Sequence, residues 1–324
     1  MALSRYAELR GTLHSFYSVT EPLSIPAQLH NLAWMHLTCV AAHRIAFAAQ
    51  QTRQASVFDN PLLRDYLWTG ALASQLLAIS RLLDSRKDVI ALPRLLNNLD
   101  QNQAGITREA YVTCDGVPYD AEPAASALLA AGHEGFKDKD GIWFFADAAT
   151  GQRLWGPRAS QMRQRRFDVW SGRSMEERQP YDVIGPRVFE VLKRELNQLK
   201  CSNIVWARHK FIAHSADAPS RSPDQLKQPG ATATRIDERQ LRRAMALTFS
   251  LARILGEILL QHAYSGPIGG LSGPETYIRG LHAAPMSNAA AARIGRLPSA
   301  MRRLFARMEC AEMRRIEGQF RGAE

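Results

Sequence analysis

Residues 61–83 read PLLRDYLWTGALASQLLAISRLL, and this stretch decides the fold class. Its apolar side chains would cover nearly all sides of a helix, which is the pattern of a helix buried over most of its surface. Asp59 and Asn60 precede it as capping residues, and Pro61 suits a first helical position. The pattern predicts a helix over 61–83 at the centre of the core of a mainly α-helical protein.

Helical spacing of apolar residues recurs on both sides of this stretch. One helix is expected to begin near Leu92, and another to run from Asp182 to about His214. The other expected helices span 2–18, 24–54, 237–264 and 292–324. Before the last of these, the sequence SGPIGGLSGP at 265–274 predicts a linker, because Gly and Pro interrupt helices.

The character of the sequence changes between residues 101 and 181, where Gly and Pro become frequent. TREAYVTCDGVPYD (107–120) and DGIWFFADAATGQRLW (140–155) both resemble short strands joined by turns. An inserted irregular or small β segment is expected here. The predicted divisions are N-terminal bundle helices (1–100), the insertion (101–181), C-terminal bundle helices (182–264), and a Gly/Pro linker with a basic helical tail (265–324).

Composition indicates the class of partner and the compartment. The 324 residues carry a formal net charge of +10 with a pI near 9.8, which favours polyanions such as nucleic acid. No run of about 18 apolar residues is free of charge, and the N-terminus lacks the apolar core and cleavage site of a signal peptide. The sequence therefore predicts a cytoplasmic protein without a membrane segment. Its four scattered cysteines are expected to be reduced and mostly buried.

The sequence ARHKFIAHS, residues 207–215, combines basic and titratable side chains near the expected end of a helix. On a helix, Lys210 and His214 share one face. A histidine in the last turn titrates near neutral pH and suits general acid–base catalysis on a phosphodiester, while Arg208 or Lys210 counters charge in the transition state. This chemistry requires no metal and no cofactor.

With these residues the sequence resembles the HEPN superfamily of helical proteins, and within it the AbiU-type abortive-infection proteins. The signature of the superfamily is an Arg, usually followed by a polar residue, with a His four to six residues beyond, and 208–214 fits it. Two earlier blocks also recur in the AbiU-type group, in forms like ISRLLD (79–84) and LPRLL (92–96). The resemblance covers roughly 25–100 and 183–262.

The resemblance implies an antiparallel helical bundle that acts as a metal-independent endoribonuclease with the RNA 2′-hydroxyl as nucleophile. It implies a homodimer, a role as a toxin or in phage defence, and in some cases an antitoxin or regulatory partner. Arg208 and His214 would be catalytic. Supporting or RNA-binding residues would be Lys210, Arg81, Asp84 and His209, the last of which stands where Asn or Asp is commoner in the superfamily.

Other interpretations remain open. The chain could be a non-catalytic helical module that binds a nucleotide, RNA or a protein, or a structural protein whose basic C-terminal helix docks onto an acidic partner. The arginine-rich stretch 158–178 could contact phosphates, with Phe167 and Trp170 stacking on bases, but a solvated loop is the preferred interpretation. Arg81 and Asp84 could instead form a local salt bridge and end a helix. The histidines of 24–54 are expected in the core or at its rim, because their spacing forms no metal-ligand face.

Overall fold

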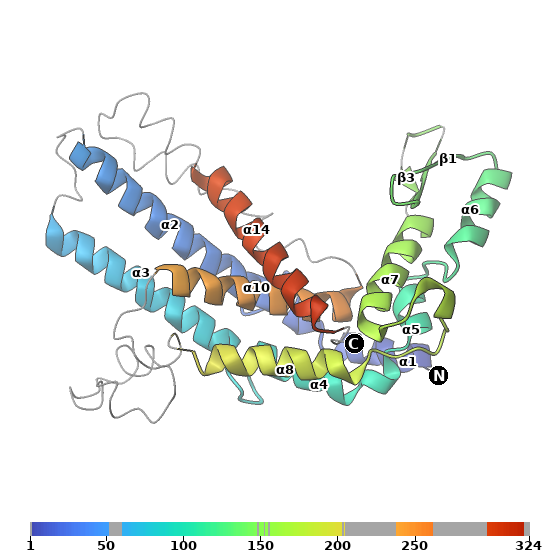
Figure 1. The fold of residues 1–324 in the computed structure, drawn as a ribbon, viewed down its shortest axis with the longest axis horizontal. Coiled ribbons are helices and arrows are strands. Elements are labelled where there is room, and N and C mark those ends of the chain that lie inside the picture. Colours follow the sequence, from blue (N-terminus) through green and yellow to red (C-terminus); the bar gives the residue numbers. More distant parts are fainter. Residues whose placement is uncertain are drawn as a thin grey trace.

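The computed structural model describes residues 2–51, residues 60–202 except 148, 152 and 155, residue 204, and residues 238–261 and 297–320. Over these residues the chain is mainly helical with one small antiparallel sheet, as expected (Figure 1). None of the described helices is long and apolar enough to cross a membrane.

The described elements alternate long helices with short connecting ones. In chain order they are α1 (Ala2–Thr12), η1 (His14–Phe16), α2 (Ile25–Gln51), α3 (Pro61–Leu82), α4 (Leu92–Gln101), η3 (Gln103–Gly105), α5 (Arg108–Thr113), α6 (Ala121–Ala130), β1 (Glu134–Lys137), β2 (Trp143–Ala146), β3 (Arg153–Leu154), α7 (Gly156–Ser171), η4 (Met175–Glu177), α8 (Pro186–Lys200), α10 (Glu238–Leu260) and α14 (Leu297–Gly318).

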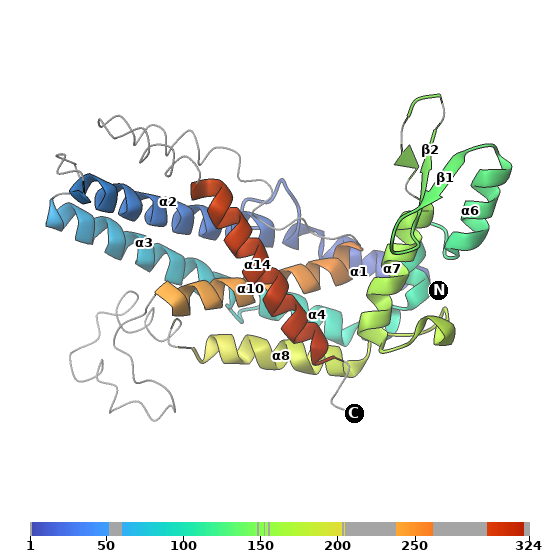
Figure 2. The same ribbon diagram turned by 45° about the horizontal axis from the view of Figure 1, so that its top comes forward.

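Helix α10, and not α3, lies at the centre of the core. It packs against α3, α4, α8 and α14, and nearly every residue from Leu241 to Leu259 is buried. Helix α3 buries Ile79 and other residues of its second half, but Leu62 near its start is 80% exposed. The reason is that α2 and α3 form a hairpin whose free end projects from the body (Figures 1 and 2). The expected helix at 61–83 is present, but its expected central position is wrong.

Residues 101–181 contain the predicted small sheet, together with more helix than the sequence suggested. The strands pair antiparallel in the order β1-β2-β3, with Phe136 opposite Phe144, which confirms strands within 140–155. The expected strand at 107–120 is instead helix α5. Its N-terminus is capped by Thr107, whose hydroxyl accepts a hydrogen bond from the amide of Ala110. Tyr111 of α5 lies in the main core.

The expected solvated loop over 158–178 is wrong for most of its length, because Gly156–Ser171 forms helix α7, whereas residues 172–177 after it are exposed. Phe167 and Trp170 are buried on its inner face and join the main core, so neither ring is available to stack on bases. Arg163 on the same face is also buried.

The basic C-terminal helix docks onto the body of its own chain. Helix α14 crosses α10 obliquely in both views (Figures 1 and 2). Phe305, Met313 and Ile316 are buried against the body. Arg315 forms a two-pronged ion pair with the buried carboxylate of Glu195 on α8, at 3.1 and 2.5 Å. The apolar face of this helix is therefore covered within the chain.

The cysteines differ from expectation in their burial. Cys201 and Cys310 are exposed, whereas Cys39 and Cys114 are half-buried, and all four are free thiols. Burial raises the pKa of Cys39 to about 11.

His36 of α2 is buried where α3 and α14 meet α2, whereas His30 is half-buried and His43 is exposed. The Nδ1 of His36 donates to Oε1 of Gln75 on α3 over 2.8 Å, and its ring meets the edge of Phe305 on α14. Burial lowers the pKa of His36, although the Gln75 hydrogen bond and Glu238 of α10 oppose this effect. The neutral imidazole is therefore the form that fits the fold.

The free energy of unfolding should fall as the pH is lowered from about 7.5 to about 5.5, with His36 contributing. The unfolded chain gains a proton near the ordinary histidine pKa of about 6.5, while the folded chain resists protonation until a lower pH. Urea unfolding at both pH values measures the loss. The loss should be smaller in His36→Gln than in wild type and unchanged in His14→Gln, which alters an exposed histidine. Equal losses in all three proteins would contradict this role for His36.

Candidate functional site

The residues with the strongest sequence signal lie outside the described residues. These are Arg208, His209, Lys210 and His214, so their geometry stays a prediction. One expectation about them is corrected: α8 does not continue unbroken from Asp182 to His214, because it ends at Lys200.

The end of α8 has a local cause. The hydroxyl of Ser202 donates to the carbonyl oxygen of Leu199 over 2.5 Å, and the amide of Ser202 donates to the same oxygen over 3.2 Å. A serine that bonds to a nearby backbone carbonyl competes with the next helical hydrogen bond. Cys201 accordingly has a ψ of 2°, outside the helical range.

The earlier block, residues 79–84, forms the last turn of α3 and the start of a loop. Leu82 and Leu83 are buried, while Arg81 is exposed. Asp84 follows the helix, and its carboxylate accepts hydrogen bonds from the backbone amide and the Nε of Arg86, both at 3.0 Å. In this structure Asp84 thus stabilises the loop between α3 and α4.

The end of α8 lies against this loop. Nζ of Lys200 donates to the hydroxyl of Ser85 over 2.6 Å. Burial lowers the pKa of Lys200, and the charge of the neighbouring Asp84 partly opposes this shift. Further back along α8, Lys193 pairs with Asp100 of α4 over 2.6 Å. The loop after residues 79–84 therefore contacts α8 eight residues before Arg208 in sequence.

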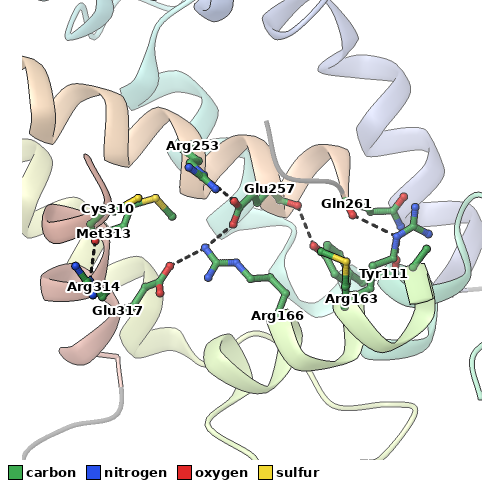
Figure 3. A pocket seen from close by; sticks show the side chains of 12 residues that line it. Tyr111, Arg163, Arg166, Arg253, Glu257, Gln261, Cys310, Met313, Arg314 and Glu317 are labelled. Atoms are coloured by element: carbon green, nitrogen blue, oxygen red, sulfur yellow. Dashed lines mark hydrogen bonds and ion pairs between the residues drawn. The ribbon is translucent and has the colours of Figure 1, made fainter. Parts of the chain in front are cut away.

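A second candidate site is a cavity of about 630 Å³ where α7, α10 and α14 meet (Figure 3). Its wall includes apolar side chains such as Met162 and Met313. The charged side chains of the wall are Arg163, Arg166, Arg253, Arg314, Glu257 and Glu317.

Ion pairs join the three helices across this cavity. Arg166 of α7 bridges two carboxylates, Glu257 of α10 and Glu317 of α14, the latter at 2.6 Å. Although burial acts to lower it, the pKa of Arg166 is raised by these two carboxylates. Arg253 adds a pair with Glu257 at 3.0 Å and one with Glu309 of α14 at 3.5 Å. Burial raises the pKa of Glu309, and Arg253 opposes this.

The end of the cavity away from Arg314 is lined by Arg163, Gln261 and Tyr111 (Figure 3). Arg163 donates to the carbonyl oxygens of Gln261 and Val112 and pairs with Asp115, so all three of its nitrogens are used. The side-chain nitrogen Nε2 of Gln261 donates to the backbone carbonyl of Tyr111. The buried Oε1 of Gln261 has no hydrogen-bond partner among the described residues.

Sequence reasoning missed this cavity. Arg253 and Glu257 stand four residues apart in the mostly apolar second part of α10, and this spacing was the available signal, because such charges need partners when buried. The sequence alone gives no indication that Arg166 and Arg314, from distant segments, share the same wall.

Comparison with protein-family models, curated proteins and solved structures finds no match to this chain.

Proposed function

We propose that this chain is a metal-independent endoribonuclease. His214 acts as the general acid–base, Arg208 binds the scissile phosphate, and Lys210 assists it. The 2′-hydroxyl attacks the adjacent phosphorus as it loses its proton, and the 5′-oxygen leaves as it gains one, giving a 2′,3′-cyclic phosphate and a 5′-hydroxyl. Imidazole suits these proton transfers near neutral pH, and the guanidinium stabilises the phosphorane-like charge.

One observation supports this proposal most directly. Residues 79–84 and the motif at 208–214 are far apart in the chain, yet the loop after residues 79–84 contacts the end of α8 through Ser85 and Lys200, eight residues before Arg208 in sequence. The helix that precedes Arg208 in the sequence is therefore anchored beside residues 79–84. The exposed Arg81 and the net charge of +10 are further features suited to a polyanion.

The proposed partner is RNA, and the proposed working form is a homodimer that places two copies of 208–214 over one strand. Action in the cytoplasm as a toxin or phage-defence effector, with or without an antitoxin, belongs to the same proposal. Light scattering during gel filtration tests the dimer, because a monomeric mass at micromolar concentration would contradict it.

Purified wild type should cleave labelled single-stranded RNA in excess EDTA and leave cyclic-phosphate ends. His214→Ala should lower the rate by about 10²–10⁴-fold, because general acid–base catalysis contributes on this order. His43→Ala is the matched control, since His43 is an exposed histidine on a helix. Circular dichroism spectra should be the same for all three proteins.

Cleavage by His214→Ala at the wild-type rate would refute the assigned role. Tight RNA binding by wild type without turnover would instead select the second candidate, a non-catalytic binding protein. That candidate has its own support in the arginine-lined cavity between α7, α10 and α14, which can hold a ligand without chemistry.

A further inference from the structure

We propose that the cavity between α7, α10 and α14 is a binding site for a small organic anion, whose phosphate or carboxylate group is held by Arg314 while its apolar body lies against Met162 and Met313. This proposal does not depend on ribonuclease activity.

The size and lining of the cavity favour a small amphipathic ligand. Its volume of about 630 Å³ lies within the ordinary range of small-molecule sites. The walls combine methionine and alanine surface with six charged side chains, most of which are paired with one another. Sites for small organic ligands have this composition, because the apolar wall contributes affinity and the polar groups fix the orientation.

The hydrogen bonds and ion pairs of the four arginines that line the cavity show which of them is available to bind an anion. Arg163 uses all three of its nitrogens, and Arg166 and Arg253 are paired with glutamates. The Nε of Arg314 bonds only to the carbonyl of Cys310, one turn back in the same helix, at 3.3 Å. Its two terminal nitrogens have no hydrogen-bond or ion-pair partner among the described residues. A guanidinium whose two terminal nitrogens are available can bind an oxyanion through two parallel hydrogen bonds.

Two further polar atoms at the cavity are unsatisfied. The Nε of Arg166 is buried and has no acceptor among the described residues. The Oε1 of Gln261 has no donor there either, although this side chain is only 3% exposed. Buried polar atoms without partners are rare, and a ligand is one way to satisfy them.

The ion-pair network alone does not account for these groups. Arg166, Arg253 and the glutamates already hold α7, α10 and α14 together, and neither Arg314 nor Oε1 of Gln261 contributes to that network. Figure 3 places Arg314 and Gln261 at opposite ends of the cavity, with Glu257 and Arg166 between them. The natural ligand should therefore be elongated, with its acid group at Arg314 and a hydrogen-bond donor toward Gln261.

The chain contains a reporter at the acid-binding end. Cys310 lines the cavity beside Arg314 and is exposed, while Cys201 is also exposed but lies outside the cavity. Alkylation by neutral iodoacetamide, followed for each cysteine by peptide mass spectrometry, measures occupancy. Phenyl phosphate and benzoate at matched ionic strength supply the two oxyanions, and benzyl alcohol supplies the same ring without charge. At half-saturation the rate at Cys310 should fall about twofold by mass action, with no change at Cys201.

Variants locate the effect. Arg314→Ala should abolish the protection of Cys310. Arg307→Ala should keep it, because Arg307 is another exposed arginine of α14 with the same kind of bond to its own helix, outside the cavity. Met162→Trp should fill the cavity and abolish protection, whereas Met175→Trp, at an exposed methionine elsewhere, should not.

Greater protection by phenyl phosphate or by benzoate identifies the acid group that the site prefers. No protection of wild type by either anion would overturn the proposal, as would equal protection by benzyl alcohol or undiminished protection in Arg314→Ala. His214→Ala should give the wild-type result. Failure here is thus distinguishable from failure of the ribonuclease proposal, which is read from RNA cleavage.

Discussion

Replacing Arg108 by methionine is expected to lower the free energy of unfolding by about 3–5 kcal/mol, the usual cost of removing one partner from a buried ion pair. The Arg108 side chain is fully buried. Its guanidinium pairs with Asp168 of α7 at 2.7 Å and with Asp182, in the loop before α8, at 3.0 Å. Methionine keeps much of the apolar volume but leaves the carboxylate of Asp182 buried without its main cation.

Arg108 also links three parts of the fold through other bonds. Its Nη1 donates to the side chain of Gln164 and its Nη2 to the hydroxyl of Ser171, while its backbone amide donates to the carbonyl of Asp182. The guanidinium lies over the ring of Phe167, 5.0 Å from its centre. Loss of the side chain should therefore loosen α5, α7 and the loop before α8 together.

Urea denaturation followed by tryptophan fluorescence measures the effect. Arg86→Met is the control, because Arg86 pairs with Asp84 at 3.0 Å but is largely exposed, and exposed ion pairs contribute about 0–1 kcal/mol. The double variant Arg108→Met/Asp182→Asn should recover part of the loss, since the buried charge is removed with its partner. Equal destabilisation by Arg108→Met and Arg86→Met would contradict the importance of burial.

The helices whose buried faces are apolar could be predicted from the sequence. Helix α4 begins at Leu92 with Pro93 near its start, as predicted, and its buried side chains follow helical spacing. The aromatic run in β2 likewise identified the sheet. In both cases local preference and burial point to the same structure.

Helix α7 could not be predicted in this way, because much of its buried face is polar. Arg163, Gln164 and Ser160 all point inward. They are satisfied by backbone carbonyls from other segments, such as that of Tyr119, which accepts from Ser160 and Gln164. A search for apolar periodicity cannot recognise a face whose burial depends on distant hydrogen-bond partners.

The central position of α10 was missed for a similar reason, because its buried charges depend on partners. The helix at 61–83 was predicted to lie at the centre of the core because it is apolar on nearly all sides, whereas α10 carries Arg253 and Glu257. Their ion pairs with each other and with α14 permit burial of the helix around them. The cavity escaped prediction for this reason, while the assignment of Arg208 and His214 rests on the sequence motif.

Gly256→Ala should destabilise the protein by about 1–3 kcal/mol, the cost of overpacking a core. This is opposite to the gain of about 1 kcal/mol that Ala has over Gly inside a helix. A Cβ at this position of α10 would lie 2.8 Å from Cε1 and 2.9 Å from Cζ of Tyr17. The Tyr17 ring is buried, and its hydroxyl donates to the carbonyl of Ala252, so the ring cannot retreat without breaking that bond.

Two comparisons separate packing from helix propensity. Gly70→Ala in α3, where a Cβ meets nothing within 4 Å, should stabilise the protein by about 0.5–1 kcal/mol. In a Tyr17→Leu background the side chain that blocks position 256 is shorter, so Gly256→Ala should become neutral or stabilising. A loss as large in that background as in wild type would show that Tyr17 is not the cause. A reversal of sign would establish that α10 has glycine at this position because Tyr17 of the N-terminal segment packs directly on its backbone.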